Sequence, residues 1–438
     1  MMQDHPFAAL LSGINPITHR GVLQAVLPGR LESMGPKAVI GDLCKIVPAG
    51  GEEEKLAEVV ALTHDKTVLM PLDSCESLSV GDRVIRTDTH RMTVVGEGLK
   101  GRILSALGKP IDGRPEATAD FLWPLAGKPL NPMERDVAAS PLSTGVRAID
   151  GCLPLAKGQR IGIFAASGVG KTTLVEQIMQ NVEADNLVLC LVGERGREVA
   201  VLWSALQAAG IANKATLFVA TSDESAAVRA RVVNAALAQA EYLRSKNKDV
   251  VLFVDSSTRY AMALREMGLS AGEPPTVRAY TPNVFAQLPR MVERCGASAS
   301  GGSITAFFTV LAETDDVDDP IVEVMKSLLD GHIILSREIA ASGRYPAIDV
   351  LNSVSRLADK VICDRQQKAL LKLRASMFRL REAQLLIESG LHKPGNNKSL
   401  DRSIARRSDI ETFLAQSTSG AATPTDTLNA LEKLVEQL

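Results

Sequence analysis

The stretch RIGIFAASGVGKTTLVEQI, residues 160–178, decides the fold. A short apolar run predicts a buried strand over 159–164, a loop of small residues follows, and an amphipathic helix begins near Thr172. Such a loop lets several backbone N–H groups converge on one phosphate, and the helix N-terminus adds positive potential. Lys171 would reach the β- and γ-phosphates, and the Thr172 hydroxyl would bind Mg²⁺. The stretch therefore predicts a nucleoside triphosphate site.

The loop departs from the strict motif at its start, where Ala165 and Ala166 occupy the first two places. Alanine is a known variant at the first place, whereas Ala166 demands a conventional backbone angle at the second. The strand before the loop and the helix after it supply the context that the motif needs. We expect the nucleotide to be bound by Ser167, Gly168, Val169, Gly170, Lys171, Thr172 and Thr173.

Two later strands end in acidic residues. The run VVLFVDSS, residues 250–257, ends at Asp255, which we interpret as the second Mg²⁺ contact; the alternative is a residue that caps the next helix. The run NLVLCLVGERGREV, residues 186–199, brings Glu194 to the same sheet edge as the phosphate loop, where it could polarise the attacking water. The alternative is a surface glutamate paired with Arg195 or Arg197, and spacing alone does not decide.

The pattern of strand-like and helix-like segments along the chain indicates three domains. Short strands punctuated by Gly, Pro and Asp predict a small β-barrel within residues 1–95. Apolar runs that alternate with longer helical segments predict a parallel sheet with crossover helices over 96–360, and the family resemblance described below implies that this is a RecA-like ATPase domain. Helical periodicity without strand runs predicts a C-terminal helical domain over 361–438. The expected fold class is α/β.

Composition narrows the classes of function. The 438 residues carry a formal net charge of −2 and 4% aromatic residues, which argues against a nucleic-acid partner. The six cysteines are scattered, as in proteins of a reducing compartment, and no apolar run approaches a membrane span. The N-terminus lacks the features of a secretion signal. Its residues Phe7, Leu10 and Leu11 form either a frayed end or a docking helix.

Several long stretches, in order, resemble the type III export ATPases of flagella and injectisomes, which are relatives of the rotary ATP synthase α and β subunits. They include FAASGVGKTTL (164–174), LVGERGREV (191–199), FVDSSTRYAMALREMGLSAGEPP (253–275) and YPAIDVLNSVSRLADKV (345–361). GEGLKGRILSALGKPIDG (96–113) resembles the family's link between barrel and ATPase core. The resemblance covers residues 21–361 and is weaker beyond.

The resemblance assigns roles that spacing does not. It implies that Glu194 activates the catalytic water and that Arg195 lies near the γ-phosphate. It implies that Arg356 is an arginine finger for a neighbouring subunit, although alone it reads as a solvated residue. Tyr345 would stack on adenine; a Tyr-Pro turn in the core is its alternative. The segment TVRAYTPNVF, residues 276–285, would face a central pore, or else is a surface loop.

The resemblance also implies the setting. We expect a homohexamer that hydrolyses Mg·ATP to release chaperones from export substrates, unfold those substrates and deliver them to a membrane-embedded export gate. The family implies a peripheral stator-type regulator at the N-terminus and a central stalk protein. We expect a cytoplasmic protein peripherally associated with the inner-membrane export apparatus. SGVGK and GRYPAID favour the flagellar system. An injectisome ATPase is the main alternative; a rotary synthase subunit and a nucleic-acid translocase are weaker ones.

Overall fold

The structure is a computed structural model that describes residues 20–87, 91–136, 140–312, 319–418, 420–436 and 438. It divides into two compact units. One comprises the described part of residues 1–92 together with 223–230 and 263–284; the other comprises the described part of 93–222, 231–262 and 285–438. The possible N-terminal docking helix lies outside the described residues. The predicted domain boundaries at residues 95 and 360 stay predictions.

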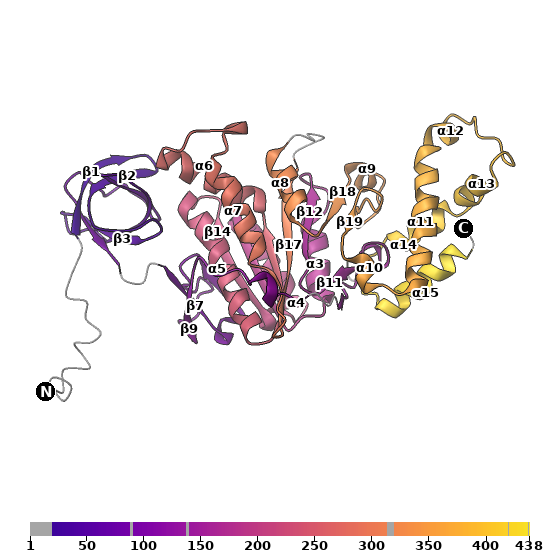
Figure 1. Ribbon diagram of the computed structural model, residues 1–438, viewed down its shortest axis with the longest axis horizontal. Helices are drawn as coiled ribbons and strands as arrows, with labels where there is room; N and C mark the ends of the chain where they lie inside the picture. The colour runs from indigo at the N-terminus through magenta and orange to yellow at the C-terminus, as the bar shows by residue number, and fades with distance from the viewer. Residues whose placement is uncertain (1–19, 88–90, 137–139, 313–318, 419, 437) are drawn as a thin grey trace. The chain divides into compact units, whose positions relative to one another are not determined.

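Six antiparallel strands close the predicted N-terminal barrel in the order β1-β2-β5-β4-β3-β6 (Figure 1). Alternate side chains point inward, so that Leu23, Leu31, Ile46, Val59 and Leu69 are almost fully buried. The strands are β1 (Arg20–Leu27), β2 (Arg30–Met34), β3 (Leu43–Val47), β4 (Lys55–Leu62), β5 (Thr67–Pro71) and β6 (Arg83–Arg86).

The second unit is built on a nine-stranded sheet, counted within the described residues. Its main path runs β19-β18-β12-β17-β15-β13-β14-β8, and β16 pairs with β17. All neighbours are parallel except β18 with β19 and β16 with β17. The strands are β8 (Arg102–Ser105), β12 (Arg160–Ala165), β13 (Asn186–Glu194), β14 (Ala215–Thr221), β15 (Asp249–Asp255), β16 (Gly296–Ala297), β17 (Ser303–Leu311), β18 (Gly331–Leu335) and β19 (Val354–Ser355).

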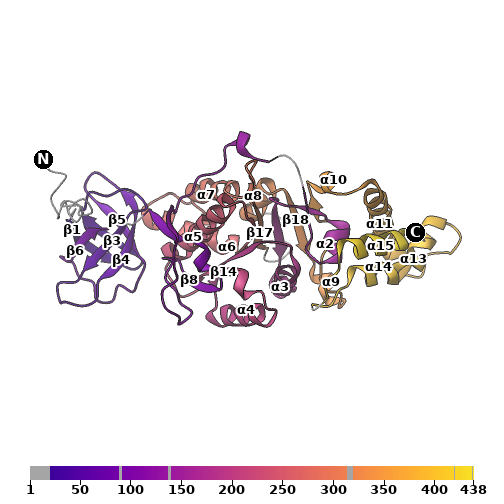
Figure 2. The same ribbon diagram turned by 90° about the horizontal axis from the view of Figure 1, so that it is seen from below.

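Helices cover both faces of this sheet, as crossover connections between parallel strands require. Helices α3 (Lys171–Asn181) and α4 (Gly196–Ala208) lie on one side, and α5 (Ala226–Ser245), α7 (Pro282–Glu293) and α8 (Pro320–Leu328) lie on the other (Figure 2). Helix α6 (Ser257–Ala271) follows β15. In α3 the buried residues Leu174, Val175, Ile178 and Met179 form one stripe, which packs into the core.

The C-terminal helices share the core of the sheet. Leu373, Ile410, Phe413 and Leu431 belong to the same buried cluster as Ile178 of α3. These helices are α11 (Asp364–Glu382), α12 (Gln384–Glu388), α13 (Lys398–Ala405), α14 (Arg407–Leu414) and α15 (Pro424–Val435). The expected class of barrel, RecA-like sheet and C-terminal helices is confirmed.

Short elements complete the chain. The segment expected to face a pore forms the 3₁₀ turn η4 (Val277–Ala279) and the start of α7, and its pore-facing role stays a prediction. Among the described residues, no helix combines the length and apolar character needed to span a bilayer. The remaining elements are β7 (Met92–Val95), η1 (Glu97–Leu99), β9 (Phe121–Pro124), η2 (Pro132–Glu134), β10 (Pro141–Leu142), α2 (Arg147–Cys152), β11 (Leu155–Ala156), η3 (Ala212–Lys214), α9 (Arg337–Ala341) and α10 (Ala358–Val361).

Candidate active site

The phosphate loop connects β12 to α3. Gly168 and Gly170 have φ values of 81° and 90°, a region that side chains other than glycine rarely adopt. Gly170 is the N-cap of α3, so the loop ends at the positive end of that helix. Ala166 is not among the non-glycine residues with positive φ in the described chain, so alanine fits the second place of the motif. The strand lies one residue later than the sequence predicted.

A cleft of about 430 Å³ opens over this loop. It gathers the loop and the ends of β13 and β15, because the carboxyl ends of parallel strands meet at one sheet edge. Its walls include nine of the predicted site residues: Ser167, Gly168, Gly170, Lys171, Thr172, Thr173, Glu194, Arg195 and Asp255. Val169 is instead 3% exposed and belongs to the hydrophobic core, so its side chain holds the loop in place.

Asp255 is fixed by two side chains. Its Oδ1 atom contacts Lys171 Nζ and accepts a hydrogen bond from Thr309 Oγ1 at 2.6 Å. The residue is 9% exposed, and both contacts of its Oδ1 atom lie away from α6. The carboxylate therefore points toward the phosphate loop, as a metal-binding role requires.

Glu194 lies at the end of β13 and is only 6% exposed. Its Oε2 atom is 2.8 Å from Arg259 Nη1, and Arg259 also donates to the carbonyl oxygen of Gly193. Arg195 does not serve as its partner, because the Arg195 side chain is 82% exposed and lies 4.0 Å from Glu198. Glu194 is therefore a buried glutamate paired with Arg259 and not a surface glutamate paired with Arg195.

Burial raises the pKa of Glu194 to about 7. The hydrogen bond with Glu198 and the charge of Asp255 act in the same direction, whereas Arg259 and Lys171 oppose them. A carboxyl group that titrates near neutral pH can both take up and release a proton under working conditions, which suits a general base.

Three residues of the site were missed by sequence reasoning: Glu198, Arg259 and Thr309. Glu198 and Arg259 line the cleft, and Thr309 holds Asp255 from the neighbouring strand β17. Arg259 follows Asp255 by four residues and lies in the first turn of α6, and this position is the only sequence signal for it.

The residues of the cleft fit a magnesium ion bound together with phosphates. Thr172 and Asp255 offer hydroxyl and carboxylate oxygens, the hard ligands that Mg²⁺ prefers. Among the described residues, no group of three or more His, Cys, Asp or Glu side chains forms a self-sufficient metal site. This donor set matches an ion that keeps water and phosphate ligands.

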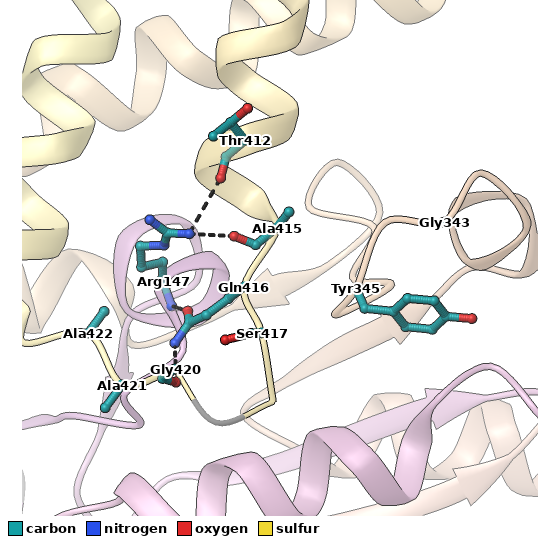
Figure 3. Close-up of a pocket in the computed structure, with 10 residues that line it drawn as sticks. All are labelled: Arg147, Gly343, Tyr345, Thr412, Ala415, Gln416, Ser417, Gly420, Ala421 and Ala422. Carbon is teal, nitrogen blue, oxygen red and sulfur yellow. Dashed lines mark hydrogen bonds between the residues drawn. The ribbon is translucent and has the colours of Figure 1, made fainter.

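A second cavity, of about 650 Å³, contains Tyr345. The Tyr345 ring packs against the phosphate loop, because a Cβ atom added at Gly170 would lie 3.3 Å from Tyr345 Cε1. The side chain is 43% exposed, so the alternative of a tyrosine in the core does not hold. The loop after α14 also lines this cavity, and there Gln416 donates to the carbonyl oxygen of Gly420 at 2.7 Å (Figure 3). Gln416 donates in addition to the carbonyl oxygen of Gly145 at 2.7 Å.

Arg356 does not line the cleft of its own chain. It follows β19, its side chain is exposed, and its Nη2 atom donates to the carbonyl oxygen of Lys326 at 3.3 Å. An exposed guanidinium with one weak hydrogen bond is available to other partners.

The fold and the cleft define a P-loop ATPase of the barrel, RecA-like and helical type. Consistent with this, the family model described as ATP synthase alpha/beta family, nucleotide-binding domain, matches residues 145–355. The model described as T3SS EscN ATPase C-terminal domain matches residues 362–433.

Known proteins narrow the class further. The chain is 42% identical to the flagellum-specific ATP synthase of Treponema pallidum, over 96% of this chain and 94% of that protein. It is 41% identical to the type 3 secretion system ATPase of Xanthomonas euvesicatoria, over 95% of this chain and 93% of that protein. The structure of the assembled ATPase EscN from enteropathogenic E. coli matches with a TM-score of 0.90 and 38% identity, over 95% of this chain and 100% of that one. This chain belongs to the type III export ATPases of the ATP synthase α/β family.

Proposed function

We propose that this chain hydrolyses Mg·ATP as the motor of a type III protein export apparatus. The observation that carries the catalytic part is the buried carboxyl of Glu194, which shares one cleft with the phosphate loop, Lys171 and Asp255. Phosphoryl transfer to water needs phosphate donors, a metal contact and a group that orients and deprotonates the water. The described cleft contains a residue for each task.

The phosphate loop would bind the triphosphate. Backbone N–H groups from Ser167 to Thr173 and the N-terminus of α3 supply the donors. With ATP bound, we expect Lys171 to donate to the β- and γ-phosphates instead of contacting Asp255. The Thr172 hydroxyl and the Asp255 carboxylate are the groups that would hold a magnesium ion, which would supply positive charge to offset that of the phosphates.

Glu194 would accept a proton from the attacking water. Its ionised form is needed for this step, and Arg259, at 2.8 Å, orients the carboxylate and favours ionisation. Arg195, exposed at the mouth of the cleft, would add positive charge near the γ-phosphate. Arg259 would thus keep the base charged, whereas Arg195 would stabilise the charge that develops as the phosphate transfers.

Adenine would occupy the cavity beside the phosphate loop and stack on Tyr345. In a homohexamer, Arg356 would reach the nucleotide of a neighbouring subunit. Its exposure and its position outside its own cleft support that role. A guanidinium that arrives across an interface makes hydrolysis depend on assembly.

For the cellular role we favour flagellar export, with chaperone release, unfolding and substrate delivery as its steps. The relatives give no preference, since one flagellar and one injectisome protein match at 42% and 41% identity. The sequence stretches SGVGK and GRYPAID support the flagellar choice. A second solved structure, of EscN in complex with its central stalk EscO, matches with a TM-score of 0.87 and 37% identity, which supports a stalk partner.

The remaining partners follow from this role. They are a peripheral stator-type regulator at the N-terminus, export chaperones with their substrates, and a membrane-embedded export gate. We place the protein in the cytoplasm, at the inner-membrane export apparatus. We propose no nucleic-acid partner, because the chain has a formal net charge of −2 and only 4% aromatic residues.

The test is a chromosomal Glu194→Gln replacement in the source bacterium, scored for swimming and for secreted proteins. Glu183→Gln is the matched control, because Glu183 is an exposed carboxylate outside the cleft. Loss of swimming and of flagellin export only in Glu194→Gln supports the flagellar motor. Normal swimming with missing effectors indicates an injectisome motor. An unchanged secretion profile rejects an export role.

A further inference from the structure

A third cavity, of about 480 Å³, lies at the sheet edge opposite the phosphate loop. It forms where α5 ends and where β15 and β17 begin, whereas the phosphate loop follows the carboxyl end of β12. Its walls include Trp123, Pro124, Lys128, Leu130, Arg244 and Ser298. The cavity is therefore separate from the nucleotide cleft, and its volume is that of sites that hold whole small molecules.

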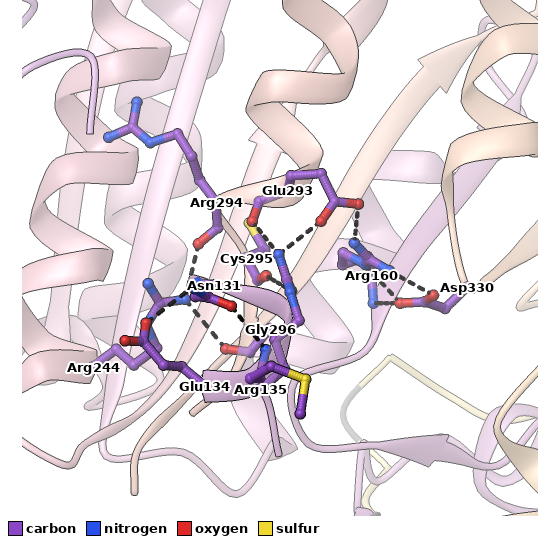
Figure 4. Close-up of polar contacts among 11 residues, drawn as sticks. Asn131, Glu134, Arg135, Arg160, Arg244, Glu293, Arg294, Cys295, Gly296 and Asp330 are labelled. Carbon is purple, nitrogen blue, oxygen red and sulfur yellow. Dashed lines mark hydrogen bonds and ion pairs between the residues drawn. The ribbon is translucent and has the colours of Figure 1, made fainter. Parts of the chain in front are cut away.

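The notable residue in this wall is Arg244, which as a whole is only 5% exposed. Its Nη1 atom donates to the carbonyl oxygens of Arg294 at 2.9 Å and Gly296 at 3.3 Å (Figure 4). These two bonds orient the guanidinium plane. Within the described residues, Arg244 has no carboxylate within ion-pair distance, and its Nε and Nη2 atoms make no hydrogen bond.

The free Nε–Nη2 edge is the one that this protein uses elsewhere to bind carboxylates. Arg102 donates to Asp112 from Nε at 2.7 Å and from Nη2 at 3.0 Å. The same edge joins Arg160 to Asp330 and Arg294 to Glu241. The charge of Glu241 in the same wall favours the charged form of Arg244 but does not occupy this edge. The Nε and Nη2 donors are not among the fully shielded side-chain atoms, so they are open to the cavity, where an oxyanion would meet two donors already held in place.

The wall around Arg244 is preformed. Arg294 is 2% exposed and binds Glu241, the Asn234 side chain and the Leu125 carbonyl oxygen. Trp123 Nε1 donates to Glu241 at 3.1 Å, so the Glu241 carboxylate in this wall is already matched. A Cβ atom added at Gly127 would lie 2.4 Å from Arg294 Nε, which shows how closely this loop fits the guanidinium.

We propose that this cavity binds a small organic oxyanion, either a carboxylate or a phosphate ester. The two free donors of Arg244 would pair with two oxygens of the anion, and Lys128 at the rim would add positive charge. The apolar body of the ligand would lie against Trp123, Pro124 and Leu130. The proposal is independent of the ATPase mechanism.

Trp123 gives a direct assay. The chain has two tryptophans, Trp123 and Trp203, so the full-length Trp203→Phe protein reports on this cavity alone by fluorescence. Benzoate and phenyl phosphate are the probes, and benzyl alcohol is the uncharged control. We expect a saturable fluorescence change with at least one anion, weaker binding of benzyl alcohol, and no competition by Mg·ATP. The tighter of the two anions identifies the oxyanion class.

Arg244→Lys keeps the charge but removes the two-donor edge, so it should weaken probe binding at least about tenfold. Lys128→Ala, at an exposed position, should weaken it several-fold without a risk to folding. Lys246→Ala is the control, because Lys246 lies over the Phe121 and Tyr242 rings and not in the cavity wall. The proposal is overturned by an absence of saturation with both anions, by unchanged affinity in Arg244→Lys and Lys128→Ala, or by displacement of the probe by Mg·ATP.

Discussion

The acid limb of the pH profile tests the catalytic role of Glu194. Its pKa is raised to about 7, and the ionised carboxylate is the base. The ionised fraction then rises from about 0.09 at pH 6 to about 0.9 at pH 8, so kcat/KM for ATP should rise about tenfold over that interval. Because kcat/KM reports on free enzyme and free substrate, it samples the site in which this pKa applies.

Two substitutions should move this limb in opposite directions. Glu198→Gln removes the carboxyl whose hydrogen bond raises the pKa of Glu194, so the limb should shift to lower pH. Arg259→Gln removes a charge that lowers this pKa, so the limb should shift to higher pH and activity at pH 7 should fall. Glu183→Gln, the same chemical change at an exposed position, should leave the profile unchanged.

The measurement is steady-state ATP hydrolysis at saturating Mg²⁺ and constant ionic strength, with kcat and KM determined at each pH. Three results would contradict the reasoning. One is a kcat/KM that varies less than about twofold between pH 6 and pH 8. The others are a shift of the limb in Glu183→Gln, or shifts of the same sign in Glu198→Gln and Arg259→Gln.

Three further substitutions test the loop and the core. Gly170→Ala should lower the free energy of unfolding by about 1–2 kcal/mol and raise the KM for ATP. Gly210→Ala, at a glycine with φ 71°, should cost the same stability and leave the KM unchanged. Urea unfolding measures the stability of each variant, and steady-state kinetics measures its KM. Leu373→Ala, at a fully buried position of α11, should lower the free energy of unfolding by about 2–5 kcal/mol, and a loss below about 1 kcal/mol would show that the site collapses or is not core. Arg294→Met should lower the free energy of unfolding by about 3–5 kcal/mol, because it leaves the buried Glu241 carboxylate without a positive partner. Adding Glu241→Gln should recover part of this loss, and a double mutant no more stable than Arg294→Met would refute the ion pair.

Local chemistry explains why the phosphate loop could be predicted in detail. Strand β12, the loop and α3 are consecutive, and the two left-handed glycines follow from the sequence itself. The predicted bounds of the strand differ from those observed by one residue, because Ala165 is small and apolar enough either to extend a strand or to begin a loop. Elements whose geometry is set by neighbours in the chain are therefore the ones that sequence patterns describe best.

The partner of Glu194 could not be predicted for the opposite reason. Sequence proximity favoured Arg195 and Arg197, but α4 begins directly after Arg195, which faces outward at its N-cap. Arg259 reaches Glu194 because β13 and β15 are neighbours in register, with Leu191 opposite Asp255. Strand order is a non-local property, and no periodicity in a single chain encodes it.

The C-terminal helices illustrate how such non-local contacts reach the nucleotide site. Gln177 lies on α3, the helix that begins at the phosphate loop, and its Nε2 atom donates to the carbonyl oxygen of Ser417 at 3.1 Å and to that of Gly420 at 3.4 Å. The backbone N–H of Gln416 donates to the Tyr345 carbonyl oxygen at 2.9 Å. One loop after α14 is thus hydrogen-bonded to the phosphate-loop helix and to the tyrosine that we propose stacks on adenine. A shift of α3 on nucleotide binding would have to move or break these bonds, so the helical part and the nucleotide site are mechanically joined.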